Sequence, residues 1–197
     1  MISITAAAAA LQRESPVAGM TLHRLLYYAQ ATALIQRGVP LFPEDFQAWR
    51  RGPVSRDLRN GRPDHTPVPL EDRDLLRATW ATYGHLSAAQ LGDLSRDDAP
   101  WTDTRGHLPP AAPCDRVIAQ EAILTYFLGR ELVQDPGGRW IHAAPTDAQW
   151  ARAKARLVIA RQARLGALGG EDRRAFIGRQ VVATQRLEGL TVLCPTV

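Results

Sequence analysis

The stretch LHRLLYYAQ at Leu22–Gln30, followed by PLFPEDFQAWRRGPVSRDL at Pro40–Leu58, decides the fold of this chain. Apolar residues in and after the first segment recur at the i, i+3, i+4 and i+7 spacing, which predicts a helix over 18–37. Gly38 stands where a glycine commonly ends a helix. The prolines and aromatic residues over 39–53 predict an irregular or partly extended crossing that packs over the core.

Apolar residues recur at helical spacing along nearly all of the chain outside this stretch. We therefore predict a mainly α fold: a compact helical domain with short irregular or extended crossings, followed by a C-terminal helical extension. The further elements predicted for the domain are a helix over Ile4–Glu14, a turn or short helix near 55–59, a helix over Leu70–Tyr83 ending at Gly84, a short helix that Ser87 caps, and a helix from Cys114 or Asp115 to about Gly129.

The chain is predicted to divide into a helical domain over 1–130 and an extension over 131–197 that packs on it. Turn residues between short apolar segments and long basic helical patterns define the extension. It comprises, in order, a hairpin or tight turn around Asp135-Pro136-Gly137-Gly138, a basic helix from Thr146 or Asp147 to Leu168, a break at Gly169-Gly170, a second basic helix from Glu171, and an edge strand or tail over 189–197.

The composition fits one sizeable core with an appendage, because the 197 residues are 45% hydrophobic and 22% charged. The net charge of +4 is unevenly placed: positions 1–144 hold 15 basic and 16 acidic residues, and the remainder holds 9 and 4. A basic end of this kind can bind nucleic acid or an acidic partner, although arginines solvated on helix faces are the commoner explanation.

Cysteine use and hydropathy predict the compartment. Cys114 and Cys194 are far apart in the sequence, which fits neither a disulfide framework nor a thiolate metal site, so a reducing, cytoplasmic location is expected. The run Ala6–Ala10 is short and has no basic residue before it, so we interpret it as part of the opening helix and not as a signal peptide. No stretch is long and apolar enough to span a membrane, and no membrane association is expected.

Motifs that carry chemistry are mostly missing. The five histidines form no His-x-x-x-His or His-Glu-x-x-His pair, and the glycine pairs lack the context of a phosphate-binding loop. Cys114 precedes a predicted helix, but no histidine accompanies it. We expect no catalytic, cofactor-binding or metal-ligating residue, and hence neither an enzyme nor a cofactor. The densest acidic patch, for which exposed helix-end carboxylates are the alternative to a site, consists of Asp97, Asp98, Asp103 and His107.

Two tryptophan-containing motifs are predicted to form fixed corners. In WRRGPV at Trp49–Val54, Gly52 allows a backbone angle that other residues resist, and Pro53 fixes the next one. The first and last residues of this motif flank the corner as apolar anchors. After the short helix, Pro100 is expected to stop the helix and Trp101 to pin the loop by burying its indole. We interpret both motifs as fold-defining corners; the alternative is a surface that faces a partner.

Arginines around the first corner are expected to project outward, where they can bind an acidic groove or phosphates. A second group of residues shares one arc of the predicted C-terminal helix with apolar side chains. There the cationic stems either cover apolar surface or dock an acidic partner. The candidate partner-binding residues are Arg50, Arg51, Arg56, Arg59, Trp150, Lys154 and Arg161.

These motifs resemble those of the Panacea-domain family of SocA-like antitoxins and phage-associated proteins. That family is typically marked by a leucine-rich helix close to LQKLLYYAQ, a Trp-x-x-Gly-Pro-Val corner and a Leu-Thr-His segment shortly before Pro-Trp. Here Ser95-Arg96 stands in place of Thr-His, so no activity that depends on that histidine is carried over. The matching family-motif positions include Leu25, Leu26, Tyr27, Trp49, Gly52, Pro53, Val54, Pro100 and Trp101.

The resemblance implies an interaction protein: an antitoxin that binds and neutralises a cognate protein toxin encoded by an adjacent gene, with a protease or chaperone as a further partner where the toxin is delivered for proteolysis. The extension from about Glu131 is then a candidate specificity element. Two alternatives come from the residues themselves. One is a metal-dependent hydrolase at the acidic patch, and the other is a nucleic-acid-binding regulator that uses Arg152, Arg156, Arg173 and Arg174.

Overall fold

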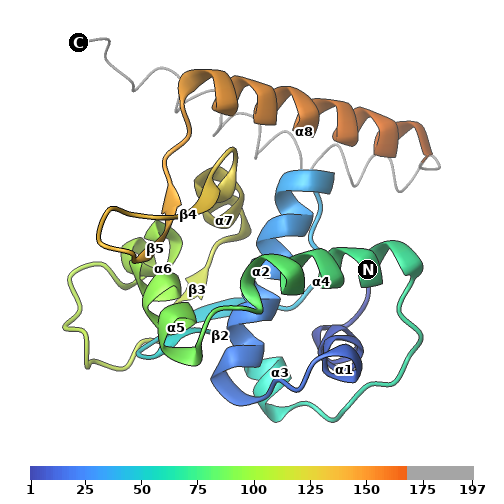
Figure 1. The fold of residues 1–197 in the computed structure, drawn as a ribbon. Coiled ribbons are helices and arrows are strands. Elements are labelled where there is room, and N and C mark those ends of the chain that lie inside the picture. The colour runs from blue at the N-terminus through green and yellow to red at the C-terminus, as the bar shows by residue number, and fades with distance from the viewer. Residues whose placement is uncertain (168–197) are drawn as a thin grey trace.

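The computed structural model describes residues 1–167, which form a mainly helical body with a small sheet and a separate hairpin (Figure 1). This confirms the predicted fold class. The elements are α1 (Ile4–Glu14), α2 (Gly19–Arg37), β1 (Phe46–Trp49), β2 (Gly52–Val54), α3 (Arg56–Asn60), α4 (Leu70–Tyr83), α5 (Ala88–Asp97), α6 (Ala99–Arg105), β3 (Val117–Ile118), α7 (Gln120–Phe127), β4 (Glu131–Gln134), β5 (Trp140–Ala143) and α8 (Asp147–Ala167).

Helix α2 is the centre of the molecule and contacts α1, α4, α5, α7 and α8 (Figure 1). At its end Gly38 adopts φ +68°, and its N–H donates to the carbonyl of Leu34, as the sequence predicted. Buried Gln30 of α2 binds the extended segment that follows the helix. Its amide oxygen accepts the N–H of Leu41 at 2.8 Å, and its amide nitrogen donates to the carbonyl of Phe42 at 3.0 Å.

The extended crossing ends in a β-hairpin. Strands β1 and β2 pair antiparallel with Trp49 opposite Gly52, so Arg50 and Arg51 alone form the turn. Strand β3 pairs with the other side of β1, giving a three-stranded sheet of order β2-β1-β3. The sheet lies beside α2, and its inward side chains join the core.

The position of β3 corrects one prediction. The helix expected from Cys114 or Asp115 begins only at Gln120, as α7. Val117 and Ile118 are β-branched and pair with β1, a strand preference that overrides the helical spacing of their neighbours. Cys114 therefore lies in a loop and not at a helix N-terminus.

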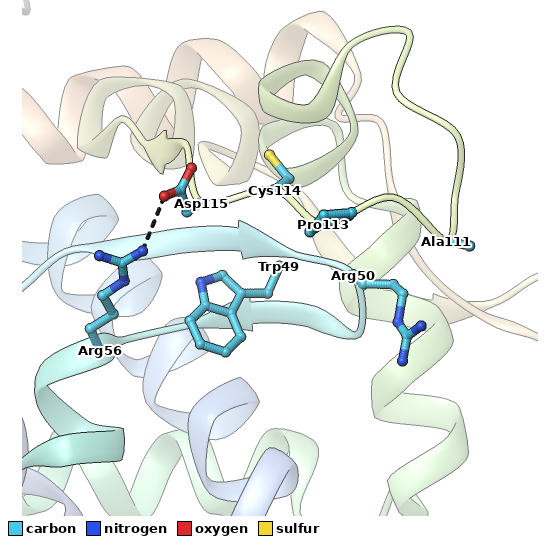
Figure 2. Close-up of a pocket in the computed structure, with 7 residues that line it drawn as sticks. All are labelled: Trp49, Arg50, Arg56, Ala111, Pro113, Cys114 and Asp115. Carbon is cyan, nitrogen blue, oxygen red and sulfur yellow. Dashed lines mark hydrogen bonds and ion pairs between the residues drawn. The ribbon is translucent and has the colours of Figure 1, made fainter.

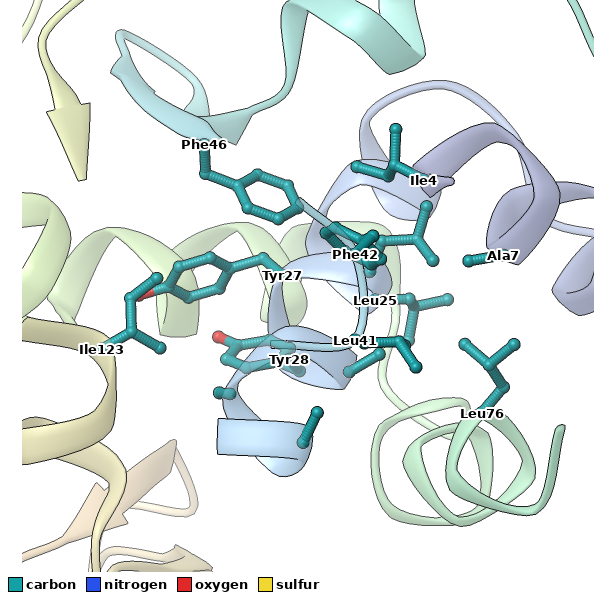
Figure 3. Close-up of a cluster of buried hydrophobic side chains, with 14 of the residues drawn as sticks. Ile4, Ala7, Leu25, Tyr27, Tyr28, Leu41, Phe42, Phe46, Leu76 and Ile123 are labelled. Atoms are coloured by element: carbon teal, nitrogen blue, oxygen red, sulfur yellow. The ribbon is translucent and has the colours of Figure 1, made fainter. Parts of the chain in front are cut away.

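The core is one cluster of buried side chains around α2 (Figure 3). Tyr27 packs edge-on against Phe46 of β1 and Phe127 of α7, with ring centroids 5.4 and 6.0 Å apart. Helix α1 contributes mostly alanines, such as Ala7, which allow its backbone to approach α2 and α4 closely. Its predicted bounds, and those of α4, are confirmed at both ends.

The corner between α5 and α6 confirms one prediction and corrects another. The Ser87 hydroxyl accepts the N–H of Gln90, so it caps α5 as predicted. Pro100 does not stop this helix: α5 ends at Asp97, and Pro100 lies in the first turn of α6, where a missing N–H breaks no intrahelical bond. Trp101 is buried, as expected.

The described part of the extension packs on the rest of the molecule. The predicted hairpin is present as β4 and β5, and β5 contacts α5. Helix α8 contacts α2, and its Arg161 is so close that a Cβ at Gly38 would lie 2.6 Å from the Arg161 Cγ. The predicted break at Gly169-Gly170, the second basic helix with Arg173 and Arg174, the strand or tail over 189–197, and Cys194 lie outside the described residues.

Buried His23 on α2 makes the junction between the helix and β2 sensitive to acid. Its Nδ1 accepts the N–H of Ser55 at 3.3 Å, which requires that nitrogen to be unprotonated. Burial, and then the positive charges of Arg59 and Arg24, lower the pKa of His23 from 6.5 to about 4. At neutral pH the imidazole is therefore uncharged.

Replacing His23 by glutamine is expected to weaken the pH dependence of stability. Between pH 6.5 and about 4 the unfolded chain binds a proton at His23 that the folded chain does not, so the free energy of unfolding falls with decreasing pH. The loss is about 3 kcal/mol across this window. A glutamine oxygen can accept the same N–H without titrating. Urea unfolding of both proteins at neutral and acidic pH measures how much the free energy of unfolding falls with pH in each. An equal fall in the two proteins would show that His23 is not the group responsible.

Candidate partner-binding groove

An open pocket of about 580 Å³ lies beside the β1–β2 hairpin (Figure 2). One wall is the end of the hairpin and the start of α3; the other is the loop between α6 and β3. We call this pocket the Trp49 groove. Its lining residues are Trp49, Arg50, Arg56, Ala111, Pro113, Cys114 and Asp115.

The tight hairpin places Trp49 and Arg50 in the groove. Gly52, opposite Trp49, adopts φ +119°, a backbone angle that favours glycine. A Cβ there would lie 3.1 Å from the Ser95 hydroxyl oxygen and 3.6 Å from the Arg24 Nε. Buried Arg24 in turn donates to the carbonyl of Arg51 at 2.8 Å, which fixes the turn from beneath. The predicted corner is therefore a hairpin that needs glycine for both angle and space.

Replacing Gly52 by alanine is expected to lower the free energy of unfolding by about 2 kcal/mol, because the φ angle is strained for an L residue and Ser95 must shift. Gly166→Ala in α8 is the matched control. Apart from its own helix backbone, no heavy atom of residues 1–167 lies within 4 Å of its Cβ position, so the helix should gain about 0.5 kcal/mol. Chemical denaturation of both variants measures the two effects, and a neutral Gly52→Ala would show that the hairpin relaxes freely.

Arg105 and Trp101 hold the two walls of the groove together. The Trp101 indole N–H donates to the carbonyl of Trp49 at 2.9 Å. Arg105, buried and stacked 4.9 Å from the Trp101 ring, donates to the carbonyl of Ala48 on β1. Its other terminal nitrogen donates to the carbonyls of Pro109, Pro110 and Ala112 in the opposite wall. The proline-rich wall is therefore held in a defined conformation.

Charge in and around the groove is mainly positive. Arg56 forms an exposed ion pair with Asp115 across the groove at 3.1 Å, and Arg59 lies 4.9 Å from the Trp49 ring (Figure 2 shows the ion pair). Arg50 and Arg51 at the turn are exposed, and their guanidinium groups form no hydrogen bond or ion pair within residues 1–167. Of the five arginines in the predicted partner-binding set, Arg50 and Arg56 line this pocket, Arg51 follows Arg50 in the turn, and Arg59 contacts the Trp49 ring.

The acidic patch proposed for a hydrolase does not assemble. Asp97 forms an exposed ion pair with Arg139. Asp98 is buried, and the histidine that contacts it is His142 and not His107. Within residues 1–167, no group of three or more His, Cys, Asp and Glu residues is arranged to hold a metal ion.

Asp98 instead forms the centre of a buried polar network that the sequence analysis missed. Its carboxylate accepts the hydroxyls of Tyr28 at 3.1 Å and Tyr126 at 3.0 Å, and Nδ1–H of His142 at 2.8 Å. The Tyr83 hydroxyl contacts His142 Nε2 at 3.0 Å. The network joins α2, α4, α7 and β5 at the α5–α6 corner. Burial, and then the Asp98 charge, raise the pKa values of Tyr28 and Tyr83, so both phenols keep their protons.

The candidate residues of α8 lie apart from the Trp49 groove. The Lys154 ammonium lies 5.0 Å from the Trp150 ring, and Arg161 is buried beside α2. A second open cleft of about 320 Å³ lies between α2, α7 and α8. Exposed Arg152 and Arg156 line it, and neither forms an ion pair within residues 1–167.

Comparison with known proteins finds similarity to SocA-like antitoxins. Residues 22–68 match the family model described as "Antitoxin SocA-like, Panacea domain". Antitoxin SocA of Caulobacter vibrioides (strain NA1000 / CB15N) is 30% identical over 112 aligned residues, which cover 44% of this chain. The chain spans 58% of the length of that relative. No solved structure matches the chain.

The fold is mainly α-helical, and the Trp49–Val54 corner lies beside a surface pocket that Trp49 lines. The segment 22–68 is similar to the Panacea domain of SocA-like antitoxins, the family that the motifs of the sequence resemble. Among the helices of residues 1–167, none combines the length and the hydropathy that crossing a membrane requires.

Proposed function

We propose that this protein is an antitoxin that neutralises a cognate protein toxin by binding it directly. The observation that carries the proposal is that the Panacea segment, 22–68, contains α2, the β1–β2 hairpin and α3, which form one wall of the Trp49 groove and support it. The similarity to an antitoxin supports the functional class. Of the family-motif positions, Trp49 therefore lies on a surface that a partner can reach, whereas Leu25, Leu26, Tyr27, Gly52, Pro53, Val54, Pro100 and Trp101 are buried.

Neutralisation by direct contact fits a preformed surface. A groove whose walls are already fixed by Arg105 and Trp101 loses little conformational freedom when a partner binds, so more of the contact energy appears as affinity. Binding alone then removes free toxin once the antitoxin is in excess. As a secondary role, we propose that the protein delivers the bound toxin to a protease. We also propose that the part of the chain from 131 onward determines which toxin is bound.

The test is gentle purification of the tagged protein from its native locus and identification of co-purifying proteins by mass spectrometry. We expect a stoichiometric partner encoded by an adjacent gene, which stops growth when expressed alone and is harmless when co-expressed with this chain. A frameshifted antitoxin gene, which keeps the RNA but makes no protein, is the control. Absence of a protein partner, or toxicity that the intact chain does not relieve, would refute the proposal.

Direct neutralisation and proteolytic delivery give different toxin lifetimes. If binding is sufficient, the purified toxin loses activity on addition of the purified antitoxin, and the half-life of the toxin in cells stays the same or lengthens. If delivery is required, neutralisation fails with purified components and the toxin half-life shortens in cells. A pulse-chase measurement beside the purified assay distinguishes the two routes.

A further inference from the structure

We propose that the Trp49 groove binds an extended acidic segment of the partner that places one apolar side chain against Trp49. This inference rests on the proposed function, since it identifies the surface and the chemistry of the toxin segment. It is carried by three features of the described residues: an apolar floor with an accessible indole, two arginines without partners, and walls that are fixed before binding.

The floor of the groove suits an apolar side chain. Trp49 is only partly buried, and its neighbours Ala111, Pro113 and Cys114 offer no charged group. A volume of about 580 Å³ lies within the range of about 300–1,000 Å³ in which pockets enclose small ligands or a few side chains. Tryptophan is among the residues that are most enriched in binding hot spots.

The rim selects for carboxylates. Arg50 and Arg51 are adjacent and exposed, and neither guanidinium has a partner within the described residues. Arg50 lines the groove and Arg51 follows it in the turn, and each guanidinium can bind one carboxylate of an acidic segment with two N–H groups. The Arg56–Asp115 pair has side chains 53% and 74% exposed, so it is weak enough for a carboxylate of the partner to displace Asp115.

A protein segment fits better than nucleic acid. A phosphate backbone carries a negative charge at every nucleotide and would place one against the Asp115 carboxylate inside the groove, whereas a peptide can place an uncharged residue there. The lining also offers one indole and no second aromatic platform on which a following base could stack. A segment with alternating carboxylates and an apolar residue satisfies both the rim and the floor.

The first experiment selects random peptides displayed on phage against the full-length protein. We expect enrichment of peptides with acidic residues around one aromatic or aliphatic residue. Arg50→Glu/Arg51→Glu should weaken their binding by about 100-fold, because two attractive contacts become repulsive. Arg152→Glu/Arg156→Glu changes the charge by the same amount at the second cleft and should alter binding by less than about 3-fold. Equal thermal unfolding of the two double variants shows that both are folded.

Cys114 reports directly on occupancy of the groove. In a Cys194→Ser background it is the remaining cysteine of the chain, and it lines the groove. A selected peptide, and the co-purified toxin, should slow alkylation of Cys114 by N-ethylmaleimide about 10-fold, whereas a peptide with glutamines in place of its acidic residues should not.

The outcomes of these experiments test the groove proposal and the antitoxin proposal separately. A selection that yields no acidic peptides, binding that survives Arg50→Glu/Arg51→Glu, or unchanged alkylation of Cys114 would overturn the groove assignment, even if a toxin still co-purifies and is neutralised. If acidic peptides protect Cys114 but no toxin exists, the groove assignment stands as a peptide site and the antitoxin proposal fails. Loss of toxin binding only in Arg152→Glu/Arg156→Glu would assign the partner to the second cleft.

Discussion

Replacement of Asp98 by alanine is expected to lower the free energy of unfolding by about 4 kcal/mol, the largest effect of any single substitution considered for this protein. The carboxylate is buried and accepts three hydrogen bonds, from Tyr28, Tyr126 and His142. Truncation leaves these buried donors without an acceptor and opens a cavity at the α5–α6 corner. Guanidinium chloride unfolding measures the loss.

Asp98→Asn is the matched variant, since it keeps the shape and one carboxamide oxygen. That oxygen can still accept from His142 and Tyr126, and the Tyr28 hydroxyl can turn to accept from the new amide. We expect a loss of about 1–2 kcal/mol. If the alanine and asparagine variants lose equal stability, the carboxylate charge and not the hydrogen-bond geometry determines the effect; if neither loses stability, the network is not structural.

Arg105→Met is expected to destabilise the protein by about 3 kcal/mol and to abolish binding at the Trp49 groove. Methionine fills similar volume and keeps contact with the Trp101 ring, but it leaves the carbonyl of Ala48 without this donor. It also releases the carbonyls of Pro109 and Ala112, so the wall opposite the hairpin is no longer fixed. A loosened wall should raise the alkylation rate of Cys114 in the free protein.

Arg116→Met is the control for Arg105→Met. Arg116 is exposed, and its guanidinium donates to the carbonyls of Thr104 and Arg105 over long distances of 3.3 and 3.4 Å. Its loss should change stability by less than about 0.5 kcal/mol and leave Cys114 alkylation unaltered. An Arg105→Met protein that resists denaturation and alkylation as well as the control would mean that the proline-rich loop holds its conformation without Arg105.

Helices whose limits depend on local residues could be predicted from the sequence. The bounds of α1 and α4, the glycine at the end of α2 and the Ser87 cap of α5 each follow from residues within one turn of the helix end. The outward exposure of Arg50, Arg51, Arg56 and Arg59 could also be predicted, because these residues lie close to the Trp49 corner in sequence. These are the features for which short-range chemistry is sufficient.

Features that depend on distant partners could not be predicted. Strand β3 exists because Val117 pairs with Gln47 of β1, and Pro100 lies in the first turn of α6 and does not end α5. The network was missed because Tyr28 and Asp98 are 70 positions apart and Asp98 and His142 are 44 apart. One signal was available: Tyr28 lies on a largely buried helix, and a buried tyrosine hydroxyl usually finds a hydrogen-bond partner, but the sequence does not indicate which residue that partner is.

Burial of the tyrosines also gives this protein an optical signature in alkali. All four tyrosines of the chain, Tyr27, Tyr28, Tyr83 and Tyr126, have pKa values raised above 10, first by burial and then, in part, by Asp98. Stability that depends on these protons is complete below pH 10 and is lost as the pH rises above it, because the unfolded chain releases protons that the folded chain retains. Phenolate absorption should therefore appear for all four rings in one cooperative step, together with loss of the helical circular dichroism. Alkali then unfolds this protein first, and the tyrosines ionise only as it unfolds.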